Sequence, residues 1–182
     1  MKATGIVRRI DDLGRVVIPK EIRRTMRIRE GDPLEIFTDK DGEVIFKKYS
    51  PIGELGTFAT QYAEALNKTS GHPTVITDRD TIIAVSGAPK RELVEKRLSP
   101  AMEKVMQGKN SVITQKSDEQ NVPVLDGDDK YAAAVVCPII SEGDSIGAVA
   151  FLANSARHSM GEVEEKLAQS AAGFLGKQMD EY

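Results

Sequence analysis

The sequence predicts an α+β protein built from two modules of different size and charge. Two observations support this prediction: short runs of β-branched residues alternate with segments of helical spacing, and the two parts of the chain differ in charge. Lys and Arg outnumber Asp and Glu by 12 to 9 in residues 1–50, whereas the remainder has 13 basic and 19 acidic residues. Ser50-Pro51-Ile52-Gly53 is typical of a boundary. We therefore expect one module at 1–50 and another at 51–182, with a linker and first helix over 51–70.

The first module follows the order strand, strand, helix, strand, strand. Asp11-Asp12-Leu13-Gly14 supplies a turn between the first two strands. Pro19 ends the second strand and suits the first turn of a helix. Asp39-Lys40-Asp41-Gly42 is a strong hairpin signal. The expected elements are strands at Gly5–Ile10 and Arg15–Ile18, a helix at Lys20–Met26, and strands at Leu34–Thr38 and Val44–Lys48.

The second module alternates apolar strands with amphipathic helices, which predicts an α/β sandwich with an antiparallel sheet. Residues 108–130 are polar and rich in turn formers, so we expect a connection there. The expected helices are Leu55–Leu66, Lys90–Arg97, Pro100–Gln107 and Glu162–Met179, and the expected strands are Thr74–Thr77, Thr81–Ser86, Tyr131–Ile140 and Ser145–Leu152.

The first module is basic and too small to bury a large core. A segment of about 50 residues without cysteines or metal ligands usually needs a partner chain. Residues 1–31 hold nine basic and four acidic residues in a chain of net charge −3. A cationic surface on an acidic protein favours a polyanionic partner, and double-stranded DNA is the most economical one.

Three motifs of the first module resemble the AbrB family of bacterial transition-state regulators. They are Thr4-Gly5-Ile6-Val7-Arg8, Leu13-Gly14-Arg15-Val16-Val17-Ile18-Pro19 and Glu21-Ile22-Arg23-Arg24-Thr25. The resemblance implies a swapped-hairpin dimer, in which two chains interleave strands into one small β-barrel that binds DNA. Arginine suits this role because its planar donors match phosphates and guanine edges. The family's DNA-binding arginines map onto Arg8, Arg15, Arg23 and Arg24, and weaker candidates are Lys2, Arg9, Lys20 and Arg27.

One position departs from the family pattern. Arg27 stands where the family commonly has a glycine after the short helix. Glycine at that place serves a left-handed helix cap. The sequence therefore leaves open whether the helix ends in the same way, and it adds a cation that could contact a phosphate.

The apolar strand pair of the second module, Ala132–Ile140 and Ile146–Phe151, resembles that of a GAF domain, a small-molecule sensing fold. The resemblance implies a pocket between the sheet and its covering loops, with Ser86, Gly87 and Cys137 as candidate contacts to a small molecule that the sequence does not identify. Cys137 itself is expected to be a buried, inert thiol.

The order of an AbrB-like head and a GAF-like body covers the whole chain. It resembles a family of transcription factors of endospore-forming bacteria that act late in sporulation, in the forespore, as activators and repressors. The resemblance implies a homotetramer, in which dimeric DNA-binding heads are joined through the GAF-like domains.

The residue patterns do not favour other chemistry. His72 and His158 lack the spacing of a zinc site, and His72, in a Gly-His-Pro turn, is expected to be exposed. We find no phosphate-binding loop and no nucleophile motif, so we expect no enzyme, no metal and no cofactor. The single cysteine and the lack of a signal-like or membrane-spanning apolar run favour a soluble cytoplasmic protein.

Two rival functions remain open. A MazE-type antitoxin would have a similar head, but it would bind its toxin through a short disordered tail, whereas residues 51–182 have clear helix and strand periodicity. A signalling enzyme with a GAF sensor would need a catalytic constellation that the sequence lacks.

Overall fold

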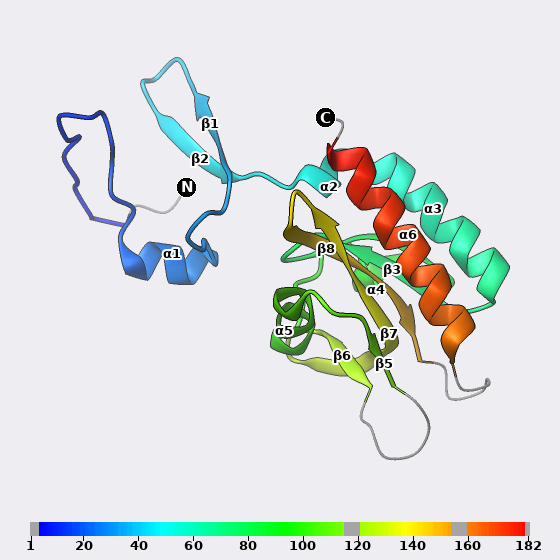
Figure 1. Ribbon diagram of the computed structural model, residues 1–182. Helices are drawn as coiled ribbons and strands as arrows, with labels where there is room; N and C mark the ends of the chain where they lie inside the picture. The colour runs from blue at the N-terminus through cyan, green and yellow to red at the C-terminus, as the bar shows by residue number, and fades with distance from the viewer. Residues whose placement is uncertain (1–3, 115–120, 154–159, 181–182) are drawn as a thin grey trace. The chain divides into compact units, whose positions relative to one another are not determined.

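The computed structural model describes residues 4–114, 121–153 and 160–180. The chain divides into two compact units, Met1–Tyr49 and Ser50–Tyr182, one residue before the expected boundary. Each unit has its own helices and strands (Figure 1). None of the helices in the described ranges has the length and hydropathy needed to span a bilayer.

The first unit consists of a short helix and a β-hairpin. Helix α1 (Lys20–Met26) precedes strands β1 (Leu34–Thr38) and β2 (Val44–Lys48), and all three have the bounds that the sequence predicted. The strands pair antiparallel, with Ile36 opposite Phe46. Asp39 stabilises the hairpin turn, because its Oδ1 accepts hydrogen bonds from the amides of Asp41 and Glu43, each 3.0 Å long.

The two strands predicted at Gly5–Ile10 and Arg15–Ile18 do not form in the single chain, so that prediction was wrong at this level. The turn between them does form: the Asp11 amide donates to the Arg15 carbonyl at 3.0 Å, and Gly14 takes a φ of 75°. A strand exists only where its backbone groups find a neighbouring strand. Among the residues described here, no strand pairs with either of these two segments.

The first unit has almost no interior of its own. Pro19 is the one buried residue among the described residues up to Tyr49. Several large apolar side chains are more than two-thirds exposed, namely Val7, Ile10, Leu13 and Val17. The hairpin exposes more of them: Ile36, Phe37, Val44, Ile45 and Phe46. Apolar surface of this extent on a folded unit is typical of an interface.

The second unit is a sandwich around an antiparallel sheet, which has six strands within the described ranges. The strand order is β4-β3-β8-β7-β5, and β6 pairs with the first part of β7. A long central hairpin dominates the sheet (Figure 1). The bounds are β3 (Thr74–Thr77), β4 (Ile82–Ser86), β5 (Val112–Ile113), β6 (Val122–Leu125), β7 (Asp128–Ser141) and β8 (Asp144–Leu152).

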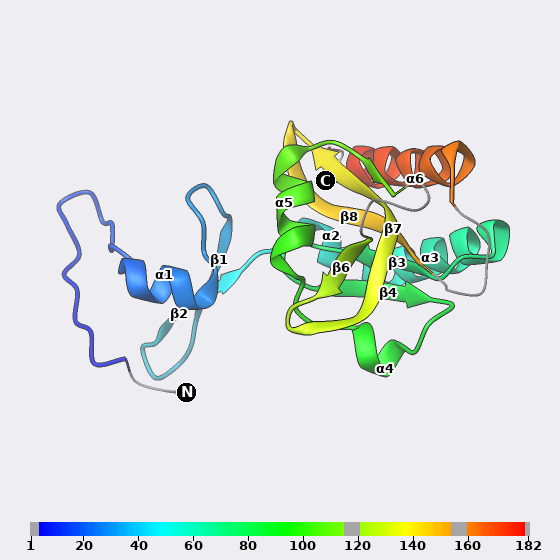
Figure 2. The ribbon, with the colours of Figure 1, turned by 90° about the horizontal axis from the view of Figure 1, so that it is seen from below.

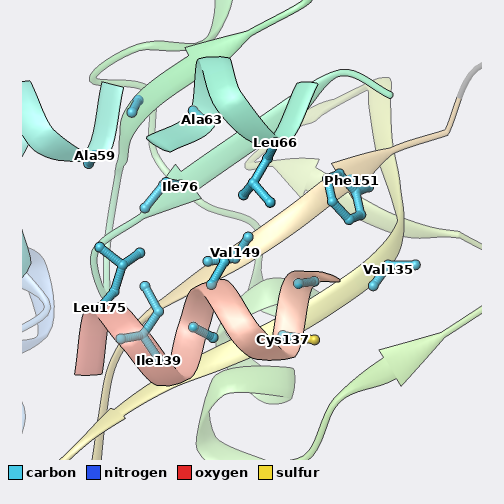
Figure 3. Close-up of a cluster of buried hydrophobic side chains, with 14 of the residues drawn as sticks. Ala59, Ala63, Leu66, Ile76, Val135, Cys137, Ile139, Val149, Phe151 and Leu175 are labelled. Carbon is cyan, nitrogen blue, oxygen red and sulfur yellow. The ribbon is translucent and has the colours of Figure 1, made fainter. Parts of the chain in front are cut away.

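Helices cover both faces of this sheet (Figure 2). One face packs against α2 (Pro51–Glu54), α3 (Gly56–Ser70) and α6 (Glu162–Asp180). The other packs against α4 (Lys90–Leu93), α5 (Pro100–Gly108) and β6. Because side chains alternate along a strand, Val135 belongs to the first core and Val136 to the second. Figure 3 shows the first core, in which Ala63, Val149 and Leu175 come from α3, β8 and α6.

Two stretches of the second unit differ from expectation. The helix expected at Lys90–Arg97 ends at Leu93, because the next residues run beside β4: the Glu95 amide donates to the Ile82 carbonyl at 2.8 Å. Residues 108–130, expected to be a connection, contain β5 and β6. Both strands are short, and they form where β7 offers pairing groups, which local composition does not reveal.

Candidate nucleic-acid interface

Helix α1 presents two of the predicted DNA-binding residues to solvent. The helix begins after Pro19, whose carbonyl accepts a hydrogen bond of 3.0 Å from the Arg23 amide. Ile22 is half-buried, whereas Arg23 and Arg24 are exposed. Since guanidinium groups stay charged at any physiological pH, this end of α1 offers two adjacent cations to a polyanion.

The structure shows how helix α1 ends at Arg27, where the family commonly has glycine. Arg27 takes the left-handed conformation, with φ 51° and ψ 41°. Its amide donates to the Arg24 carbonyl at 3.3 Å, and the Ile28 amide donates to the Arg23 carbonyl at 2.8 Å. This pair of bonds is the Schellman motif, which usually has glycine at the left-handed position. The cap geometry is therefore kept although the glycine is replaced.

Arg8 and Arg15 lie on the extended segments before α1. The Nη1 of Arg8 donates to the Val7 carbonyl at 3.3 Å. Arg15 pairs with Asp11, with 2.8 Å between Nε and Oδ2, and its side chain is 69% exposed. The pKa of Asp11 lies below its usual value, chiefly because the Arg15 amide and then its guanidinium donate to the carboxylate. An approaching phosphate would compete with Asp11 for Arg15.

The weaker candidates are distributed differently. Arg9 and Lys20 are exposed, Arg27 is half-buried, and Lys2 lies outside the described residues. The structure thus groups Arg23, Arg24 and Arg27 at the end of α1, with Lys20 at the first residue of the same helix. Arg8, Arg9 and Arg15 lie on the segments before α1. Sequence reasoning missed Lys48, whose Nζ donates to the Arg27 carbonyl at 2.9 Å across 21 residues of sequence. No local pattern signals so distant a contact.

Two of the three candidate ligand residues of the second unit, Ser86 and Gly87, lie against α3. The hydroxyl of Ser86 donates to Asn67 Oδ1 at 3.3 Å. Gly87 has a φ of 79°, and a Cβ at this position would collide with the Asn67 amide. Asn67 also donates to the His72 carbonyl at 2.7 Å. Ser86 and Gly87 therefore take part in a polar junction between the end of α3 and strands β3 and β4.

Cys137 lies apart from that junction. It is 1% exposed, and its Sγ lies 3.9 Å from the Glu165 carbonyl of α6 (Figure 3). Burial raises the pKa of its thiol. Strands β3 and β8 separate β4 from β7, so the structure does not bring Cys137 together with Ser86 and Gly87.

His72 is not the exposed histidine that the sequence suggested. It is buried, with Nε2 3.6 Å from Glu164 Oε1 and the ring centroid 6.2 Å from that of Phe151. The pKa of Glu164 is lowered, chiefly because the Gly161 amide donates to its carboxylate, with His72 contributing. The prediction failed because Glu164 and Phe151 are distant in sequence. His158 lies outside the described residues, and those that are described contain no cluster of metal-binding side chains.

Two family models match the chain. Residues 54–180 match the model described as "Stage V sporulation protein T C-terminal, transcription factor". Residues 7–53 match "Antidote-toxin recognition MazE, bacterial antitoxin". The two matches meet where the two units of the fold join.

Two proteins of Bacillus subtilis (strain 168) are similar to this chain. Stage V sporulation protein T is 56% identical over 182 residues, which are 100% of both chains. Transition state regulatory protein AbrB is 63% identical over 51 residues, which cover 28% of this chain and 52% of AbrB. The first similarity covers both units, and the second covers the head.

Solved structures resemble the second unit in fold. The GAF domain of an Acinetobacter phosphoenolpyruvate-protein phosphotransferase has a TM-score of 0.56 at 13% identity and covers 72% of this chain and 89% of that domain. A free methionine-R-sulfoxide reductase from Thermoplasma acidophilum has a TM-score of 0.53 at 12% identity and covers 72% of this chain and 96% of the reductase. Identities this low establish a GAF-like fold, and the reductase's activity does not follow from it. With a family match over residues 54–180 and a relative similar along its full length, the chain belongs to the stage V sporulation protein T family of transcription factors.

Proposed function

We propose that this protein binds double-stranded DNA as a regulator of late sporulation genes, in the forespore, as activator and repressor. It works in the cytoplasm and without enzymatic activity. The observation that supports this proposal most is that the capped helix α1 exposes Arg23 and Arg24 in the positively charged first unit. The chain also belongs to a family of transcription factors. Arg8 and Arg15 complete the proposed DNA-contacting set, with Lys2, Arg9, Lys20 and Arg27 at its margin.

A second copy of the chain completes the head in this proposal. The exposed apolar side chains of residues 6–17 and of the β1–β2 hairpin need a cover. Interleaved hairpins from a partner would supply one, and they would give residues 5–10 and 15–18 the strand neighbours that they lack. Burying a Val, Leu, Ile or Phe side chain is worth about 1.5–3 kcal/mol, so several of them suffice for a stable dimer. The dimer also doubles the number of arginines.

The body joins two such dimers in the proposed tetramer. Phe58 and Tyr62 of α3 stack on each other with ring centroids 6.0 Å apart, and each makes a tilted contact with Phe174 of α6 at 5.8 Å. Phe58 and Tyr62 are half-buried and pack against the first core, whereas Phe174 is the member of this aromatic group that stays exposed, at 42%. Phe174→Asp should convert tetramers to dimers in analytical ultracentrifugation. The control Lys177→Asp on the same helix should not, and a tetrameric Phe174→Asp variant would refute this interface.

Small-molecule sensing is the second role proposed for the body. A ligand that contacts Ser86 and Gly87 would have to displace Asn67, and one that contacts Cys137 would have to enter beneath α6. A thermal-shift screen of the full chain against metabolites tests this role, because a ligand bound only to the native state raises the unfolding midpoint.

Antitoxin activity is the alternative, and the match of residues 7–53 to the MazE model favours it. Against it stands the folded body, since a toxin-binding tail would be short and disordered. Co-purification of a toxin with the full chain from its native host would support the alternative.

The DNA-binding proposal is tested by Arg23→Ala/Arg24→Ala in the full chain, with promoter DNA at several salt concentrations. Each phosphate contact contributes about −0.9 to the slope of log K against log salt, so the variant should bind more weakly and with a shallower slope. Lys104→Ala/Lys177→Ala removes the same charge from exposed positions of the body and should change neither quantity. Unchanged affinity and slope for the arginine variant would disprove the proposed surface.

A further inference from the structure

One side chain connects the arginine-bearing helix to the β-hairpin. The ammonium group of Lys48, the last residue of β2, donates a hydrogen bond of 2.9 Å to the carbonyl oxygen of Arg27. Both residues are half-buried, in a unit whose other described residues are mostly exposed. The contact therefore joins two elements that have little shared core.

Helix α1 depends on such contacts. It has seven residues, and none of them is buried. A helix of this length is unstable on its own in water, so groups at its ends must hold it in place. The C-terminal carbonyls of a helix have partial negative charge, which an ammonium group stabilises. Lys48 supplies that charge from a strand rather than from the helix itself.

The bonded carbonyl belongs to the residue that closes the helix. Arg27 and Ile28 donate the two cap hydrogen bonds, and the acceptors are the carbonyls of Arg24 and Arg23. An anchored Arg27 thus holds the backbone of the two arginines that α1 exposes. Resting on the function proposed above, we propose that Lys48 is a positioning residue: through Arg27 it orients Arg23 and Arg24 for DNA, and it does not itself contact a phosphate.

The neighbouring residue offers a matched control. Lys47 lies opposite Glu35 in the same strand pair, whereas Lys48 lies opposite Leu34. Since successive side chains of a strand point to opposite faces, Lys47 points away from the Arg27 contact, and it is exposed. Replacing either lysine by methionine removes the same charge and keeps a similar length.

The experiment measures the DNA affinity of full-length Lys48→Met, Lys48→Arg and Lys47→Met at several salt concentrations. For Lys48→Met we expect an affinity about tenfold lower, because a hydrogen bond to a charged group is lost, with the salt slope of the unchanged protein. Lys48→Arg keeps a charged donor and should restore most of the affinity. Lys47→Met should keep nearly full affinity.

A double-mutant cycle separates positioning from independent contact. If Lys48 acts through α1, Lys48→Met should lower the DNA affinity much less in an Arg24→Ala background than in the unchanged protein. Additive losses, or a slope shallower by about 0.9 per phosphate, would show that Lys48 is a phosphate contact and would overturn the proposal. Should Lys48→Met fail to fold by circular dichroism, Lys48→Gln is measured in its place under the same criteria.

The two proposals can fail separately. If Arg23→Ala/Arg24→Ala binds DNA like the unchanged protein, the DNA surface is wrong. If that variant loses binding while Lys48→Met binds normally, only the positioning role is wrong.

Discussion

Replacing Arg27 by glycine should stabilise the head, because Arg27 occupies a conformation that suits glycine. Its φ of 51° and ψ of 41° lie in the left-handed region, which costs a residue with a Cβ about 1–2 kcal/mol. Glycine removes this cost, but it also raises the conformational entropy of the unfolded chain, which favours unfolding. The net gain of Arg27→Gly should be about 1 kcal/mol per chain. In the proposed dimeric head of about 100 residues, this would raise the unfolding midpoint by roughly 5–10 °C.

The assay is calorimetric unfolding of the full chain without DNA, in which the transition of the head is compared among variants. Arg27→Ala is the matched control: it removes the same guanidinium and its contacts but keeps a Cβ in the left-handed region. Arg27→Asn should fall between the two, since asparagine tolerates that region better than most residues. The reasoning is refuted if Arg27→Gly is no more stable than Arg27→Ala.

Two further predictions concern a close approach in the body and a turn in the head. Gly176→Ala should destabilise the body by about 1–3 kcal/mol, because a Cβ there would collide with the Ile140 carbonyl. Gly173→Ala on the same helix, with open space around it, should stabilise by up to about 1 kcal/mol in the same denaturant titration, and equal effects would contradict the packing argument. The lowered pKa of Asp11 means that its stabilisation of the 11–15 turn is present above its ordinary pKa and is lost as the pH falls through the lower folded value. After correction for the intrinsic pH dependence of exchange, the Arg15 amide should therefore exchange faster at acidic pH in the unchanged protein. The control variant Asp12→Asn should behave in the same way, whereas in Asp11→Asn the amide should exchange fast at every pH.

In the head, the elements held by interactions between residues close in sequence were predicted correctly. Helix α1 and the β1–β2 hairpin have the predicted bounds because their signals are local: Pro19 precedes the helix, and Asp39 holds the turn. The segments at residues 5–10 and 15–18 have the composition of strands, but neither pairs with another strand among the described residues. Local composition therefore predicted the turn and not the strands.

In the body too, the elements with strong local signals were predicted, and those that depend on distant pairing were not. The central strands β7 and β8 were predicted because their apolar runs are long. The short strands β5 and β6, and the chain reversal after Leu93, depend on backbone groups that β7 and β4 present. β5 and β6 are short apolar runs within a stretch that is otherwise polar and rich in turn formers, so the local sequence does not reveal their pairing.

For the candidate DNA-binding and ligand-binding sites, the sequence indicated which residues to consider better than it indicated what those residues contact. The arginines of α1 were recognised from a motif, but the Lys48 contact joins residues 21 apart. Ser86 and Gly87 were expected to meet a ligand, and the structure places them against Asn67. His72 was expected in solvent, and it lies beside Glu164. In each case the deciding partner is distant in sequence.

The sequence by itself determined the two-module organisation, the charge of the head, the family motifs and the elements whose signals lie within a few residues of one another. Only the tertiary structure decided that Arg27 keeps a left-handed cap, that Lys48 donates a hydrogen bond to the Arg27 carbonyl, and that the candidate ligand residues belong to two separate places. The physical reason is the same throughout. Turn and helix signals act through neighbouring residues, whereas burial, strand pairing and long-range hydrogen bonds depend on which distant residues the fold brings together.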